Sequence, residues 1–241
     1  MCGESIGMRI MPLTLAVLIA ASATASPVAA ADRNYSVTSF DRIRLDGSYR
    51  VRLVTGVAPF ARASGSQEAL DGVAIDVQGR TLVIRSNRSS WGGYPGRQTG
   101  PVEISIGTHD LAAAYINGSG SLSVDKVRGL SFDLAIQGAG TASITKVDID
   151  QLKVGLSGAA STTLAGRAPK MTAIIRGASL FDASALAAKD VVVGAEGPAI
   201  VRVNAISSAK IDANGTGSVE VTGGPACIVK ANGSVVITGC R

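Results

Sequence analysis

The second half of the chain alternates apolar and polar residues, and a glycine interrupts the alternation at nearly constant intervals. The glycines are Gly118, Gly138, Gly158, Gly177, Gly197, Gly215 and Gly233, with spacings of 20, 20, 19, 20, 18 and 18 residues. A period of this length is typical of solenoids, in which each repeat forms one coil that stacks on the next. We therefore predict coils of 18–20 residues over 111–241.

Apolar residues keep the same face on both sides of each glycine. Around Gly138 they stand four and two residues before it, at Leu134 and Ile136, and six residues after it, at Ile144. A two-residue hairpin would place such residues on one face with polar ones, which a buried face does not tolerate. A coil corner preserves the phase and uses the unusual backbone conformations open to glycine. The pattern predicts an all-β protein, a single-stranded parallel β-helix. No amphipathic helix follows the glycines, so they do not form phosphate-binding loops.

The first half of the chain has strand patterns with longer and less regular connections. Alternating apolar residues surround Asp46-Gly47, others precede Gln78-Gly79, and a further set runs from Val102 to Ile106. We expect less regular coils over 35–110 that close one end of the stack. Together with 111–241 they form a single domain over 32–241.

Polar positions at the same place in successive repeats predict side-chain ladders between coils. Arg176 falls beside Glu196, and Asp182, Arg202 and Glu220 follow one another with alternating sign. Adjacent parallel strands lie about 4.8 Å apart, close enough for such pairs. The asparagines before three of the glycines form a similar series. They serve as turn residues in our interpretation, although Asn-Gly-Ser/Thr also matches a glycosylation acceptor. We interpret the ladders as structural rather than catalytic.

The segment from Ser86 to Pro101 breaks the pattern with a run of glycine, proline and serine. It holds the only tryptophan, Trp91, together with Arg88, Tyr94 and Arg97. An aromatic ring and an arginine on a loop can stack on a sugar or pair with an anion. These four residues are therefore a candidate ligand-binding site. The alternative is a flexible insertion whose tryptophan covers the stack.

The first 31 residues have the features of a signal peptide. An apolar run of about ten residues, too short to span a bilayer, precedes small residues that end in Ala29-Ala30-Ala31. Translation starts at Met1 or at Met8, which is followed by Arg9. We expect export to the periplasm or the cell surface, with no transmembrane segment in the mature chain.

Removal of the leader leaves two cysteines, Cys227 and Cys240. In an oxidising compartment they can form a disulfide, or they remain as two buried thiols. Two thiols and the single His109 are too few ligands for a metal site, and we expect no cofactor and no catalytic residues. The most plausible place for His109 is the surface beside a coil entrance, with a general acid–base role as the alternative.

Composition and net charge constrain the core and the class of partner, but they do not identify a partner. Aromatic residues make up 4% of the chain, so the core must be built from valine, isoleucine, leucine and alanine. The net charge of +5 fits ordinary solvated surface, or attraction to anionic lipid headgroups or acidic polysaccharide. No nucleic-acid motif is present.

The chain resembles the family described as "putative auto-transporter adhesin, head GIN domain". The resemblance rests on Phe40–Ile43, Asp46–Leu53 and Tyr115–Val124 with its repeats, and it extends over nearly all of 35–241. It implies a right-handed parallel β-helix in an exported bacterial protein, and it implies no catalytic residues.

Three functional hypotheses follow from these observations. The first is an exported, envelope-associated or secreted scaffold that binds or adheres to cell-envelope polysaccharide or protein. The second is a carbohydrate-active enzyme, a lyase or hydrolase acting on acidic polysaccharide, which would need suitably placed carboxylates. The third is a purely structural protein of the cell envelope. We favour the first, and we expect the chain not to be an enzyme.

Overall fold

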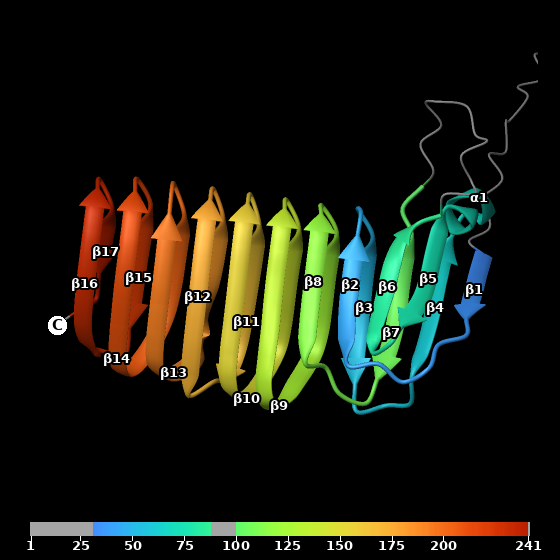
Figure 1. Cartoon of the computed structure of the whole chain (residues 1–241), viewed down its shortest axis with the longest axis horizontal. Coiled ribbons are helices and arrows are strands. Elements are labelled where there is room, and N and C mark those ends of the chain that lie inside the picture. The colour runs from blue at the N-terminus through green and yellow to red at the C-terminus, as the bar shows by residue number, and fades with distance from the viewer. Residues whose placement is uncertain (1–30, 88–99, 241) are drawn as a thin grey trace, which may run out of the picture.

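The strands of the chain wind into a long, flattened β-solenoid (Figure 1). The computed structural model describes residues 31–87 and 100–240. Regular coils are built from β8 (Ala113–Gly118), β9 (Ser121–Gly138), β10 (Thr141–Gly158), β11 (Ser161–Arg167), β12 (Lys170–Gly177), β13 (Leu180–Glu196), β14 (Ile200–Gly215), β15 (Ser218–Thr222), β16 (Ala226–Gly233) and β17 (Val236–Thr238). The coils stack in chain order, as the glycine spacing predicts.

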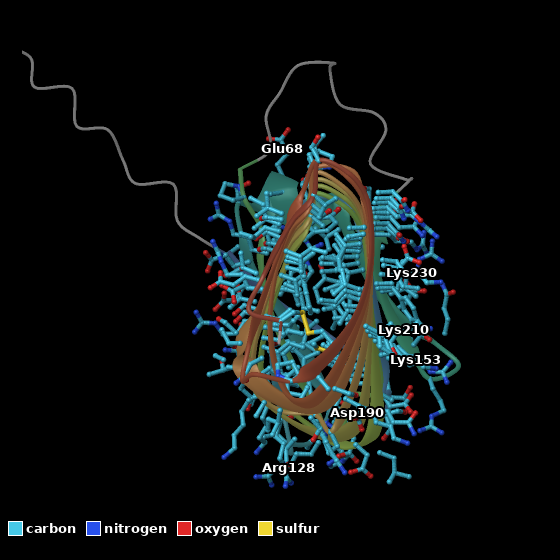
Figure 2. All side chains as sticks on the ribbon, turned by 90° about the vertical axis from the view of Figure 1, so that its left-hand side faces the viewer. Glu68, Arg128, Lys153, Asp190, Lys210 and Lys230 are labelled. Carbon is cyan, nitrogen blue, oxygen red and sulfur yellow. A yellow bond between two sulfur atoms is a disulfide. The ribbon has the colours of Figure 1, made fainter. Side chains whose placement is uncertain are left out.

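Each regular coil contributes one strand before its glycine and one strand after it. The strands before the glycines pair side by side in parallel, as do the strands after them, giving a pre-glycine sheet and a post-glycine sheet. The view along the stack shows the two sheets facing each other across a flattened interior (Figure 2). The predicted inward residues fill that interior; Leu134, Ile136 and Ile144 are all at most 2% exposed.

The repeated glycines stack on one another at one edge of the solenoid. Gly118, Gly138, Gly158 and Gly177 are register partners, and each has a φ between +91° and +115°. Their backbones lie so close that a Cβ on Gly158 would come within 2.6 Å of the carbonyl oxygen of Gly138. The corner therefore requires glycine both for its dihedral angles and for the space between coils.

The N-terminal strands do not stack in chain order. They are β1 (Ala31–Tyr35), β2 (Arg42–Asp46), β3 (Arg50–Thr55), β4 (Phe60–Gly65), β5 (Val73–Gln78), β6 (Thr81–Ser86) and β7 (Glu103–Thr108), with the helix α1 (Gln67–Asp71) between β4 and β5. The coil formed by β2 and β3 lies between the coil of β8 and β9 and the pair β6 and β7. After β1 at the outer end, the chain enters the stack at β2 and β3, builds outward through β4 to β7, and then returns across β2 to begin β8.

Part of this end is antiparallel, where the sequence led us to expect coils. β5 pairs antiparallel with β6 through the two-residue turn Gly79-Arg80, so Gln78-Gly79 is a hairpin and not a coil corner. The physical reason is the phase: Leu82 and Ile84 stand three and five residues after Gly79, at odd distances that match a hairpin. β4 pairs antiparallel with β7, and β1 with β4. These strands close the N-terminal end of the solenoid.

The C-terminal end is built differently. Among the described residues, β16 pairs only with β14, and β17 only with β15. Cys227 of β16 forms a disulfide with Cys240, which follows β17, with their Cα atoms 5.6 Å apart. The disulfide lies in the interior between the two sheets (Figure 2). It links the ends of the last coil.

The hydroxyl of Thr162 lies in the core without a hydrogen-bond partner, and its removal should stabilise the protein. Thr162 is 1% exposed and lies between Ala142 and Phe181, positions that are apolar in neighbouring coils. We expect Thr162→Val to raise the free energy of unfolding by about 1 kcal/mol, because it removes an unsatisfied buried polar group without changing the shape much. Urea denaturation measures this change.

Thr108 is the matched control for this substitution. It is also fully buried, but its hydroxyl donates to the carbonyl oxygen of Phe40 at 2.5 Å. Thr108→Val should lower the free energy of unfolding by about 1 kcal/mol or more, because the carbonyl loses its donor. A lower free energy of unfolding in both variants would show that the hydroxyl of Thr162 is not an unsatisfied group.

Candidate binding surface

The four loop residues predicted from the sequence, Arg88, Trp91, Tyr94 and Arg97, lie outside the described residues. The segment that holds them joins β6 to β7. Among the residues that the structure describes, the strongest candidate for a binding surface is the outer face of the post-glycine sheet at the N-terminal end.

Three arginines meet on this face because strands from different parts of the chain lie side by side. β3 presents Arg50 and Arg52, and β4 presents Arg62, with β7 between the two strands. Ser105 of β7 is the register partner of both Arg52 and Arg62. All three arginines are exposed, since they occupy the outward positions of strands whose alternate residues are buried.

Two neighbouring hollows in this face share Ser105 in their linings. One, of about 360 Å³, is lined by Arg50, Arg52, Glu103, Ser121 and Ser123 together with Ser105. The other, of about 670 Å³, is lined by Arg62, Asn34, Tyr35 and Phe60 together with Ser105. We call this surface the arginine groove. It crosses β1, β4, β7, β3 and β9 and therefore runs along the stack.

The arginine groove carries an excess of positive charge, with three arginines and Glu103 in its lining. Arg50 and Arg52 take part in none of the ion pairs among the described residues, and Arg62 donates from Nε only to the Asn34 Oδ1 atom at 3.1 Å. Glu103 is the single carboxylate in the lining of the two hollows. Free guanidinium groups with their planar set of donors favour carboxylate, sulfate or phosphate ligands.

A ladder of hydroxyl groups continues from the arginine groove along the same face. Two outward rows follow the arginines in register: Arg50, Ser121, Thr141 and Ser161 form one, and Arg52, Ser123, Ser143 and Thr163 form the other. Neighbouring strands repeat about every 4.8 Å, so the hydroxyls form a regular, flat array. Each hydroxyl can both donate and accept a hydrogen bond, as the hydroxyls of a sugar do.

The predicted charge ladders are present farther along the solenoid. Arg202 lies 3.7 Å from the carboxylate of Asp182 and 3.4 Å from that of Glu220, and Arg176 lies 3.1 Å from Glu196. The hydroxyl and backbone N–H groups of Ser184 donate to Asp182 and hold its pKa below the ordinary value of an aspartate. Each carboxylate in these ladders has a cationic partner, so the ladders act as links between coils.

The comparison with protein families identifies the chain. Residues 39–225 match the family model described as "Putative auto-transporter adhesin, head GIN domain". The chain belongs to this family. The arginine groove thus lies on a head GIN domain, at the end where the first matched strands stack.

Solved structures share the fold of this head GIN domain at low sequence identity. A crystal structure of a putative adhesin from Bacteroides fragilis has a TM-score of 0.78 at 19% identity and covers 88% of this chain and 96% of that chain. A putative lipid binding protein from Parabacteroides distasonis has a TM-score of 0.70 at 17% identity, with 86% and 95% covered. A putative adhesin from Parabacteroides merdae has a TM-score of 0.62 at 17% identity, with 86% and 95% covered. Among curated proteins, no match is found.

Three further expectations apply to the described part of this head GIN domain: those for His109, for metal ligands and for membrane-spanning helices. His109 is exposed and lines a separate hollow of about 620 Å³ with Asp41, Arg80 and Asp110. Asp41 in this hollow is paired with Arg80. Within 31–87 and 100–240, no three histidine, cysteine, aspartate or glutamate side chains gather as metal ligands. The same ranges hold no helix with the length and apolar character needed to cross a membrane.

Sequence reasoning did not find the arginine groove, although part of its signal was visible. Arg50 and Arg52 alternate with the inward residues Val51 and Leu53, which places both arginines on the outer face. Arg62 could not be added, because its position depends on β4 folding back antiparallel against β7. The groove exists only because these three strands are neighbours.

Proposed function

We propose that this chain is an exported adhesion scaffold that binds acidic polysaccharide through the arginine groove. The observation that carries the proposal is the set of three exposed arginines around Ser105, none of which has an ion-pair partner in the described chain. The family and the fold support a binding role, and the signal peptide predicted over 1–31 supports export. The exposed arginines of the groove support an acidic ligand.

A polysaccharide with regularly spaced carboxylates fits the shape of the surface. The arginine groove is open and continues into the hydroxyl ladder, so an extended chain can lie along the stack and contact several strands. Phe60 is 44% exposed and Tyr35 lines the same hollow, which offers apolar ring surface to the faces of sugar rings. Guanidinium groups would pair with carboxylates, and serine and threonine hydroxyls would exchange hydrogen bonds with sugar hydroxyls.

The energetics favour a polymer over a small anion. An exposed ion pair contributes only about 0–1 kcal/mol in water, so one carboxylate on one arginine would bind weakly. A polymer presents many such groups at once, and contacts after the first benefit from a high effective concentration. Adhesion through repeated weak contacts is therefore the behaviour that this surface supports.

The lining of the groove argues for binding without hydrolysis. Glycoside hydrolysis generally uses two carboxyl groups that flank the scissile bond. The lining of the two hollows contains Glu103 and no second carboxylate. A bound polysaccharide would therefore meet cations, hydroxyls and a single acid.

Charge reversal in the groove tests the proposal. We expect residues 32–241 to be retained on immobilised polygalacturonate but not on neutral dextran, and we expect Arg52→Glu to weaken retention at least about tenfold, because an attraction becomes a repulsion. Raising the salt concentration should weaken the wild-type interaction, since the contacts are exposed. Surface plasmon resonance measures both effects.

Arg42→Glu is the matched control. Arg42 belongs to the same coil and is exposed, but it lies on β2 in the pre-glycine sheet, away from the groove. The control makes the same change in net charge and should leave retention within about twofold of wild type. Equal losses of retention in the two variants would show that the arginine groove is not the binding site. Binding to anionic vesicles but not to polygalacturonate would show that the ligand is not an acidic polysaccharide. Release of reducing or unsaturated sugars would instead show an enzyme.

A further inference from the structure

The two ends of the solenoid differ in a way that points to self-association. At the N-terminal end β1 and β5 are also edge strands, but the last core layer is covered there: Leu70 of α1 and Ala63 of β4 are both 0% exposed. At the other end, β16 and β17 each have a strand neighbour on one side only within the described chain. Figure 1 shows these two strands at the end of the stack. Their outer edges carry backbone N–H and C=O groups without strand partners.

The last layer of the core is uncovered at this end. Val229 occupies an inward position of β16 and is 42% exposed, whereas its register partner Ile211 in the preceding coil is 1% exposed. Ile237 of β17 is only partly buried, whereas its partner Val219 is 1% exposed. Both differences arise because no further coil of residues 31–87 and 100–240 packs over these side chains. The end therefore presents apolar surface next to two open strand edges.

The edge of β16 carries few of the features that usually prevent strand addition, whereas β17 has only three residues. Proteins block exposed edges with charges, prolines or bulges, or keep the edge strand very short. β16 spans eight residues with Lys230 as its single charged residue, and β17 has none. Neither strand contains a proline. The edge is thus competent to pair.

We propose that a second copy of this chain covers the end, giving an end-to-end dimer with two-fold symmetry. The end offers two edge strands that run in opposite directions, β16 toward its glycine corner and β17 away from it. A two-fold axis parallel to the strands lays each β16 antiparallel against the β17 of the other copy, so both edges are satisfied together. A single strand from another polypeptide would satisfy only one edge.

Charge and shape favour this axis over the alternative. An axis perpendicular to the sheets would pair β16 with itself and bring the two Lys230 side chains near each other, which is unfavourable. The axis parallel to the strands keeps these lysines on opposite sheets. It also places glycine corner over glycine corner, so the narrow edges of the two flattened solenoids coincide (Figure 2).

The size of the end predicts a weak dimer. Eight residues of strand extend about 26 Å, and packed sheets lie about 10 Å apart. This footprint is smaller than the roughly 800 Å² per partner of a standard interface. Main-chain hydrogen bonds along both edges add to the apolar contact. We expect a weak, concentration-dependent equilibrium between monomer and dimer.

Sedimentation velocity of residues 32–241, with the disulfide intact, tests the dimer. Between about 1 and 100 µM the wild type should shift from monomer to dimer, and Val229→Lys should remain monomeric, because an ammonium group would be buried in the apolar end layer. Ile228→Lys is the matched control: it is the neighbouring residue, 65% exposed, on the outer face of the same strand. It should dimerise as the wild type does.

Hydrogen exchange gives a second measurement that does not depend on a variant. Amides of wild-type β16 and β17 should become more protected as concentration rises, while those of β9 and β10 stay constant. A monomer throughout the concentration range would overturn the proposal. A dimer that Val229→Lys leaves intact, or that Ile228→Lys disrupts equally, would do the same, because the interface would then lie elsewhere.

Discussion

Replacement of Gly158 by alanine should lower the free energy of unfolding by about 2 to 6 kcal/mol. Gly158 has a φ of +109°, a conformation that costs a residue with a side chain about 1 to 3 kcal/mol. The new Cβ would also lie 2.6 Å from the carbonyl oxygen of Gly138, and this atom belongs to a backbone that cannot rotate away. Relief of such overpacking requires the coils to separate locally, which adds about 1 to 3 kcal/mol. Denaturation followed by circular dichroism measures the loss.

Gly155 provides a control in the same strand, β10, three residues earlier. It has no positive φ, and a Cβ built there would meet nothing within 4 Å. Gly155→Ala should leave the free energy of unfolding unchanged or raise it by about 0.4 to 1 kcal/mol, because alanine reduces the entropy of the unfolded chain. Similar losses at the two positions would show that the close approach of the corners does not determine stability.

The two glycines illustrate how far the sequence predicts this fold. The period and the unbroken phase of apolar residues place Gly158 at a corner and Leu134, Ile136 and Ile144 in the core, and the structure confirms both. The ladders of Arg176 with Glu196 and of Asp182, Arg202 and Glu220 follow from the same alignment. Regular coils are predictable because each contacts only its neighbours in the chain.

The N-terminal end was harder to predict because its contacts are not between successive segments. The sequence shows strands around Asp46-Gly47 and Gln78-Gly79, but the first is a coil corner and the second a hairpin, and only the odd spacing of Leu82 and Ile84 separates them. Nothing in the spacing places β2 and β3 between the pairs β6–β7 and β8–β9. The arginine groove depends on that order, so its residues could not be assembled beforehand.

The state of the two cysteines in the C-terminal coil could not be predicted from the sequence either. Spacing alone left Cys227 and Cys240 either paired or free. In the structure, Cys227 lies in register with the buried Ala209 and faces the interior, where Cys240 meets it. The bond joins the strand before the last glycine to the segment after β17. It therefore ties the two sheets together at the last described coil.

Removal of this disulfide should loosen the last coil while the rest of the solenoid stays folded. The bond closes a loop with a sequence separation of 13 residues, and a loop of this length corresponds to about 3 kcal/mol. Because each coil depends mainly on its neighbours, the loss should be local. In Cys227→Ala/Cys240→Ala, amides of β16 and β17 should exchange about 100-fold faster, while those of β9 and β10 should not change.

The reduced wild-type chain separates the effect of the bond from that of the side chains. Reduction breaks the disulfide but keeps both thiols at their partly buried positions. If the bond restrains the coil, reduction and double substitution should speed exchange in β16 and β17 to a similar extent. A loss confined to the substituted chain would mean that sulfur packing stabilises this end. A loss that spreads to β9 and β10 would mean that the coils unfold as one cooperative unit, against the nearest-neighbour behaviour expected of a solenoid.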